Sequence, residues 1–83
     1  MIVKCVIRYP EEGLNYNWWY KVIDAKIKSV NIGGHIYYRP YVRIANATSG
    51  DDCGWHLAYN FYTTDTEQSL ENVIVDEIYK NII

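Results

Sequence analysis

The stretch IKSVNIGGHIYYRPYVRI, residues 27–44, decides the fold, because it reads as two extended segments joined at Gly33-Gly34. The ten residues after the glycines alternate between two phases, which is typical of a β-strand. A Gly-Gly pair supplies the positive φ angles that a two-residue hairpin turn requires. In such a hairpin, residues whose numbers add up to 67 face each other. The inward pairs expected from this register are all apolar: Ile23–Ile44, Ala25–Val42 and Ile27–Pro40.

Segments on either side of this hairpin predict the remaining elements. Residues 2–9 alternate, are rich in β-branched side chains and stop at Pro10, and residues 55–63 form another strand-like run. Near the end, Asp65 and Gln68 resemble a capping box. Apolar residues then recur at helical spacing at Leu70, Val73, Ile74, Ile78 and Ile82. We therefore expect an α+β fold, ββββα: a four-stranded antiparallel sheet with one C-terminal helix packed on one face.

Pro40 constrains the order of the strands, because proline cannot donate a ladder hydrogen bond and favours an edge strand or a bulge. A strand order of 3-2-1-4 satisfies this constraint, and a 1-2-3-4 meander is the alternative. An edge strand of this kind could also permit a homodimer.

Size and composition indicate one small soluble domain, residues 1–83. The hydrophobic fraction of 49% and charged fraction of 22% are ordinary for a globular protein. The net charge of −2 gives no general attraction to nucleic acid or membrane. The N-terminal residues do not resemble a signal peptide, and no apolar run reaches membrane-helix length. We expect a cytoplasmic protein with no membrane partner, in which Cys5 and Cys53 are free thiols.

The outward phase of the predicted sheet concentrates positive charge. Six of the eight basic residues fall on the face opposite the helix, together with only one acidic residue, Asp24. Lys26 and Tyr41 would face each other, as would Lys28 and Arg39, where like charges repel. Two interpretations are open: the solvated face of any two-layer domain, or a contact surface. Under the second, the candidate partner-binding residues are Lys4, Arg8, Trp18, Lys26, Lys28, Tyr37, Arg39, Tyr41, Arg43 and Tyr62.

Two other short segments contain residue types that are common at functional sites. Trp18 and Trp19 begin the second strand, and alternation predicts that one is exposed, which we take to be Trp18.

The segment DDCGWH brings Cys53 and His56 close together in sequence. A zinc site commonly needs two close pairs of ligands, and a catalytic nucleophile needs an oriented base and an oxyanion site. The sequence offers neither arrangement, so we expect no metal, no cofactor and no catalytic residues.

These features together favour a non-catalytic binding protein, an inhibitor or adaptor that docks its Tyr/Arg/Lys-rich sheet face on a partner protein. In size, lack of a catalytic signature and content of residues with AT-rich codons, the chain is similar to small phage-encoded inhibitors of host machinery, such as anti-CRISPR and other anti-defence proteins. This similarity is one of composition and involves no specific residues. The alternative is a small single-stranded nucleic-acid-binding module that stacks bases on Tyr37, Tyr41 and Tyr62. The sequence does not identify the partner.

Overall fold

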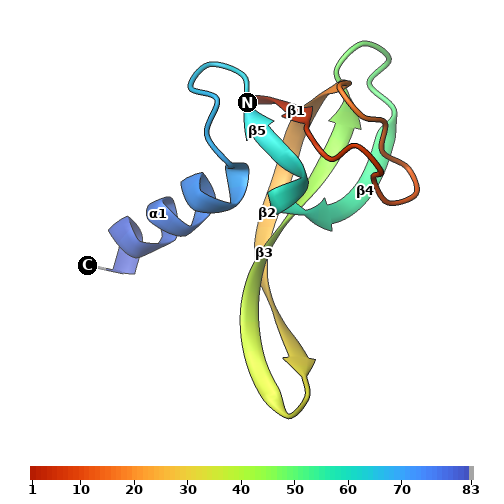
Figure 1. Ribbon diagram of the computed structural model, residues 1–83. Coiled ribbons are helices and arrows are strands. Elements are labelled where there is room, and N and C mark those ends of the chain that lie inside the picture. Colours follow the sequence, from red (N-terminus) through yellow and green to blue (C-terminus); the bar gives the residue numbers. More distant parts are fainter. Residues whose placement is uncertain (83) are drawn as a thin grey trace.

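The computed structural model describes the backbone of residues 1–82 and the side chains of residues 1–76. It is a small α+β domain with an antiparallel sheet and one C-terminal helix (Figure 1). The elements, in chain order, are β1 Ile2–Cys5, β2 Trp19–Ile32, β3 His35–Asn46, β4 Asp52–Leu57, the 3-10 helix η1 Ala58–Asn60, β5 Phe61–Thr63 and α1 Leu70–Ile82.

The sheet has five strands in the order β4-β3-β2-β1-β5, so the prediction of four strands is wrong. The expected fourth strand is interrupted by η1, which separates β4 on one edge from β5 on the other. The buried Asn60 stabilises this turn, because its side-chain amide donates to the Leu57 carbonyl at 2.8 Å. Since only η1 joins the two edge strands, the sheet must curl until its edges approach each other, and the core fills the space that the curl encloses.

The register of the β2–β3 hairpin follows the prediction from Asp24–Arg43 to Ile32–His35. Nearer the core a β-bulge interrupts it, and Val22 rather than Ile23 lies opposite Ile44. Val22 packs against the core, whereas Ile23 is 52% exposed. The predicted inward position of Ile23 is therefore wrong, because an extra residue in one strand reverses the faces of the residues that precede it.

Pro40 lies on an internal strand, although the sequence suggested an edge. The ladder between β3 and β4 begins at Tyr41, which faces Leu57, the last residue of β4. Pro40, the next position along β3, has no N–H to offer a further strand on that side. The proline thus coincides with the end of β4. The observed order contains both proposed orders, since β1-β2-β3-β4 is the meander and β3-β2-β1-β5 is the order 3-2-1-4 with β5 as the last strand.

The core contains two aromatic residues at its centre. Tyr20 and Phe61 are both buried and meet edge to face, with ring centroids 5.9 Å apart. The Tyr20 hydroxyl accepts the Asn15 N–H at 2.8 Å, and burial raises the pKa of this phenol. Around the two rings pack the other buried apolar residues, Val3, Cys5, Leu14, Val42, Ile44, Ala58, Leu70 and Ile74.

The helix α1 begins at Leu70, later than the capping pattern at Asp65 predicted. The Ser69 carbonyl accepts the N–H groups of Asn72 and Val73, and Glu67 has a positive φ of 53° that belongs to a turn. Leu70 and Ile74 attach the first turns to the core, while the rest of α1 projects away from the sheet (Figure 1). The predicted packing of Ile78 and Ile82 concerns side chains outside the described ones. Within residues 1–82 no helix has the length and hydropathy required to cross a membrane.

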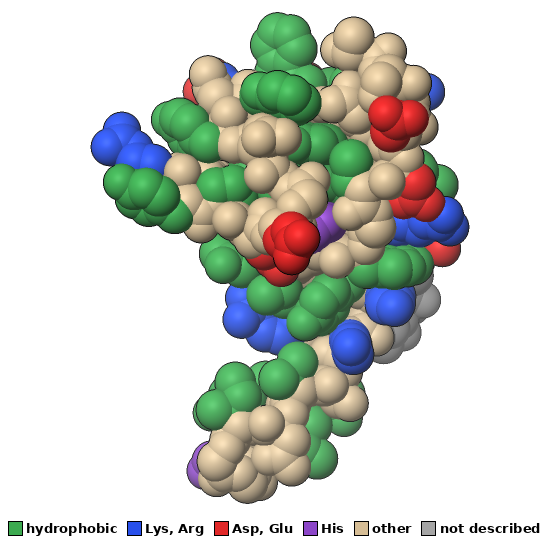
Figure 2. Space-filling model, turned by 90° about the vertical axis from the view of Figure 1, so that its right-hand side faces the viewer, with side chains coloured by type: hydrophobic (Ala, Val, Ile, Leu, Met, Phe, Trp, Pro, Cys, Tyr) green, Lys and Arg blue, Asp and Glu red, His purple; other side chains and the backbone are tan. Residues whose placement is uncertain are grey.

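The distal part of the β2–β3 hairpin extends beyond the rest of the sheet, and residues 29–38 are here called the arm. β1 pairs with β2 only at residues 19–21, and β4 pairs with β3 only at residues 41–45. In the space-filling view the arm forms a separate lower lobe (Figure 2). The hairpin therefore stops pairing with β1 and β4, and stops packing against the core, before the arm begins.

Candidate protein-binding surface

Basic and aromatic side chains gather where β2, β3 and β4 lie side by side, on the sheet face opposite the core. The ladders place Lys26 opposite Tyr41 and Arg43 opposite Trp55, and Lys28 is the next outward residue of β2. We call Lys26, Lys28, Tyr41, Arg43 and Trp55 the outer patch. Three adjacent strands thus build it, and each contributes residues of the outward phase.

The two lysines of the outer patch lie over aromatic rings. The Lys26 ammonium is 4.0 Å from the centroid of the Trp55 ring, and the Lys28 ammonium is 5.5 Å from that of Tyr41. The Lys28–Tyr41 contact is diagonal between neighbouring strands, whereas the Lys26–Trp55 contact reaches from β2 across β3 to β4. Lys26 and Tyr41 face each other in the ladder as predicted, but the Lys26 ammonium lies over Trp55 instead. Long side chains reach diagonal neighbours on a sheet, and a cation is attracted to the face of an aromatic ring. Neither lysine makes an ion pair within residues 1–76.

Arg43 is held by Asp52 of β4. Its Nε donates to Asp52 Oδ2 at 2.9 Å, and its Nη2 contacts the same oxygen. This hydrogen bond raises the pKa of Arg43 and lowers that of Asp52, to which the Gly54 N–H also donates. Asp24, which faces Arg43 in the β2–β3 ladder, instead accepts the N–H of Ala25. The positive charge of Arg43 is therefore offset within the molecule.

Arg39 is held by the helix. Its Nη2 lies 3.3 Å from Glu71 Oε1, and its guanidinium carbon lies 5.5 Å from the centroid of the Tyr59 ring. Lys28 faces Arg39 as predicted, but Glu71 of the same chain offsets the expected repulsion between the two like charges. The expectation that the basic face lies opposite the helix is wrong at this position, because the curl of the sheet brings Arg39 to the first turn of α1.

A second exposed surface surrounds Trp19. Lys4 of β1 faces Trp19 on one side and Tyr62 of β5 on the other. Two shallow grooves share Lys4 and Trp19 in their walls; one, of about 540 Å³, includes Tyr62, and the other, of about 710 Å³, includes Trp18. Trp18 and Trp19 are both more than half exposed, because Tyr20 takes the core position. Sequence reasoning anticipated the exposure of Trp18 but missed that of Trp19.

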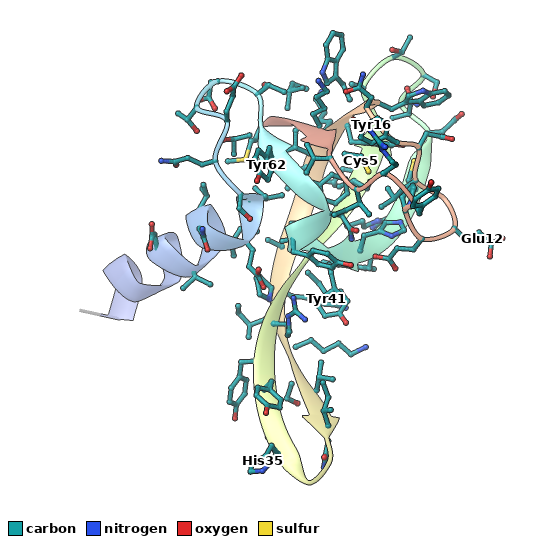
Figure 3. All side chains as sticks on the ribbon, in the orientation of Figure 1. Cys5, Glu12, Tyr16, His35, Tyr41 and Tyr62 are labelled. Atoms are coloured by element: carbon teal, nitrogen blue, oxygen red, sulfur yellow. The ribbon has the colours of Figure 1, made fainter. Side chains whose placement is uncertain are left out.

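The ten candidate residues therefore do not form one face. Tyr41 and Tyr62 lie on different parts of the molecule, with β2 and β1 between their strands (Figure 3). Tyr37 lies on the arm, and Arg8 lies in the loop between β1 and β2. The structure brings four of the ten into the outer patch: Lys26, Lys28, Tyr41 and Arg43.

Trp55 is the member of the outer patch that sequence reasoning missed. Unbroken alternation over residues 55–63 would place Trp55 and Phe61 on the same face, but η1 breaks the alternation, so Trp55 faces outward and Phe61 is buried. The sequence signal that could have revealed this is the residue type at Asn60, because asparagine favours turns and is depleted in strands.

The DDCGWH segment supplies structural contacts. His56 is buried, with Nε2 2.8 Å from the Cys53 carbonyl and Nδ1 3.8 Å from a Glu11 oxygen. Glu11 also accepts a hydrogen bond of 2.7 Å from the amide of Asn60. These contacts hold the loop between β1 and β2 against β4 and η1. In the described part of the chain, His, Cys, Asp and Glu form no group of three that could bind a metal ion.

Comparison of the chain with protein-family models, with curated proteins and with solved structures finds no match.

Proposed function

We propose that this chain is a non-catalytic protein-binding module that docks its outer patch on an acidic surface of a partner protein. The observation that carries the proposal is the stacking of Lys26 on Trp55, with Lys28 beside Tyr41. Both ammonium groups keep donors available for carboxylates, and the rings hold them in place before a partner arrives. Such preorganisation lowers the entropy cost of association.

The composition of the outer patch supports a protein partner. Tyr, Trp and Arg are enriched at the energetically dominant positions of protein interfaces, and Tyr41, Arg43 and Trp55 lie next to one another in the β3–β4 ladder. A partner of this kind is consistent with an inhibitor or adaptor, the class of small phage-encoded proteins that the composition suggested.

The alternative, binding of single-stranded nucleic acid, receives less support. Arg39 and Arg43 are engaged by Glu71 and Asp52, so fewer cations remain for phosphates. The tyrosines that were expected to stack successive bases, Tyr37, Tyr41 and Tyr62, lie on three separate parts of the molecule.

The proposal is tested by affinity capture from an extract of the source cells, with two variants that make the same charge change. Lys28→Glu reverses a charge in the outer patch, and Arg8→Glu reverses one in the loop. We expect Lys28→Glu to lose the captured protein and Arg8→Glu to retain it. Equal capture by both variants would contradict the proposal.

Fluorescence anisotropy with a single-stranded oligonucleotide tests the alternative, which predicts affinity that falls steeply with salt.

A further inference from the structure

The arm is free of formal charge. From Ser29 to Tyr38 the chain contains no Asp, Glu, Lys or Arg, and His35 is its only titratable residue besides two tyrosines. Its apolar side chains are open to solvent: Tyr38 is 74% exposed and Ile36 62%. In Figure 2 the lower lobe accordingly carries apolar and histidine side chains but no blue or red ones. A partner recognised by charge would find no counter-charge there.

The strand edges of the arm are also free. An isolated two-stranded hairpin is marginally stable, and an unpaired edge is a template for pairing with another strand. Natural edge strands are commonly protected by Lys or Pro. On β3 the free edge ends at Pro40, and β4 pairs with the strand from Tyr41 onward, whereas β2 contains no proline and pairs with β1 only at residues 19–21. The β2 edge, which includes Ser29 to Ile32, is therefore the less protected one.

The hairpin register shows which backbone groups point outward on this edge. Ile32 and His35 flank the two-residue turn, so their N–H and C=O groups point toward each other. Because these groups alternate along a strand, those of Val30 also point toward β3, and those of Ser29 and Asn31 point to the free edge. The edge thus offers two donors and two acceptors in the spacing of an antiparallel ladder.

We propose that a second copy of this chain pairs with the β2 edge of the arm, antiparallel and centred on Val30. Ser29 of each copy then faces Asn31 of the other, and the two arms form a four-stranded sheet. A two-fold axis perpendicular to the sheet, midway between the two Val30 residues, relates the two strands as an antiparallel pair, so the contact closes with two chains.

A second copy fits the arm because pairing two identical arms brings no like charges into contact. In this register Lys28 of each copy lies opposite Ile32 of the other. The two Lys28 residues are then separated by four residues along the ladder, roughly 13 Å, which exceeds the Debye length of about 8 Å at physiological salt. The pairing is edge to edge, so the outer patch remains open, and the inference does not rest on the proposed function.

The interface is small, and the dimer is accordingly concentration-dependent. Two short arms cover less than the roughly 800 Å² per partner of a standard interface. In sedimentation velocity runs over about 10–500 µM chain, we expect the weight-average mass to rise from the 9.8 kDa of one chain toward twice that value. A mass that stays at 9.8 kDa throughout would overturn the inference.

Two variants at one position test the register. Ser29→Pro removes an N–H that points to the free edge, so it should abolish dimer formation without breaking the β2–β3 ladder. Ser29→Ala keeps that N–H and should dimerise as the wild type does. The inference would be overturned if Ser29→Pro still formed the dimer, or if Ser29→Ala lost the dimer as completely as Ser29→Pro.

A shortened arm gives an independent test that does not depend on the tolerance for proline. Deletion of residues 29–32 and 35–38 joins Lys28 and Arg39 through Gly33-Gly34 and preserves both register and face, since four residues leave each strand. We expect a monomer at every concentration, with the wild-type circular dichroism of the remaining sheet. A dimer of the shortened chain would show that another surface is responsible and would overturn the inference.

Discussion

Arg39 of β3 and Glu71 of α1 form an ion pair, with Nη2 and Oε1 3.3 Å apart, that connects the sheet to the first turn of the helix. Both side chains are about one-third exposed, and the Arg39 guanidinium also lies over the ring of Tyr59. An arginine that the sequence places on a solvent-facing strand thus contributes to holding the helix on the core.

We therefore predict that Arg39→Ala lowers the melting temperature. A partly exposed ion pair contributes about 0.2–1 kcal/mol and an exposed cation–π contact about 0.5–1 kcal/mol. Thermal unfolding followed by circular dichroism should detect the change, with Lys28→Ala, the facing residue without an ion pair within residues 1–76, as the matched control. An unchanged melting temperature for Arg39→Ala would mean that the pair contributes nothing to stability.

The contrast at Arg39 illustrates what the sequence could and could not predict. The Gly33-Gly34 turn and the alternating pattern predict nine ladder pairs of the hairpin correctly, those of Asp24 to Ile32, because register follows from local turn geometry. Sequence periodicity could not reveal the bulge at Ile23 or the turn η1, since both depend on tertiary contacts of single residues. Each of these interruptions reverses side-chain faces beyond it, and this is why Ile23 and Trp55 point outward.

The bulge gives a second prediction, with neighbouring residues as a matched pair. Val22 packs against the core, and Ile23 points into solvent. Val22→Ser should destabilise the protein by about 1–3 kcal/mol, whereas Ile23→Ser should stay within about 0.5 kcal/mol. Chemical denaturation of both variants measures the two values. A larger loss of stability in Ile23→Ser than in Val22→Ser would support the register without the bulge.

Asn60 should be essential to the closure of the sheet. Its amide donates to the Glu11 carboxylate and to the Leu57 carbonyl, and the residue is fully buried. Asn60→Ala leaves these acceptors without their donor and should cost about 1–3 kcal/mol in unfolding free energy. Asn72→Ala, at an exposed helix position, serves as the control and should be nearly neutral. Comparable losses in the two variants would argue against this role for Asn60.

The pairing of Arg43 with Asp52 predicts a pH dependence. Arg43 lowers the pKa of Asp52 below the ordinary aspartate value of 3.8, so the carboxylate binds a proton less readily in the folded state. The resulting stabilisation is present above the unfolded pKa and is lost as pH falls through the folded pKa. The difference in melting temperature between wild type and Asp52→Asn should therefore shrink as pH drops from 6 to below about 3.8. A difference that is constant with pH would exclude a contribution from the ionised carboxylate.

The two free cysteines should differ in reactivity. Cys5 is buried, and burial raises the pKa of its thiol, whereas Cys53 is only partly buried. Because the thiolate is the reactive form, iodoacetamide should label Cys53 first in the native protein and Cys5 only after unfolding. Peptide mass spectrometry after timed labelling measures both rates. Equal rates in the native protein would contradict the buried position of Cys5.

The central claim, that the outer patch docks on a partner protein, is tested most directly by site-specific photo-cross-linking in the source cells. Benzoyl-phenylalanine replaces Tyr41 in the outer patch or, as an aromatic control, Tyr9, which is 89% exposed in the loop between β1 and β2. The account predicts a discrete protein adduct from position 41 that is absent from position 9 and is lost when Lys28→Glu is added. An adduct from position 9 together with none from position 41 would contradict it.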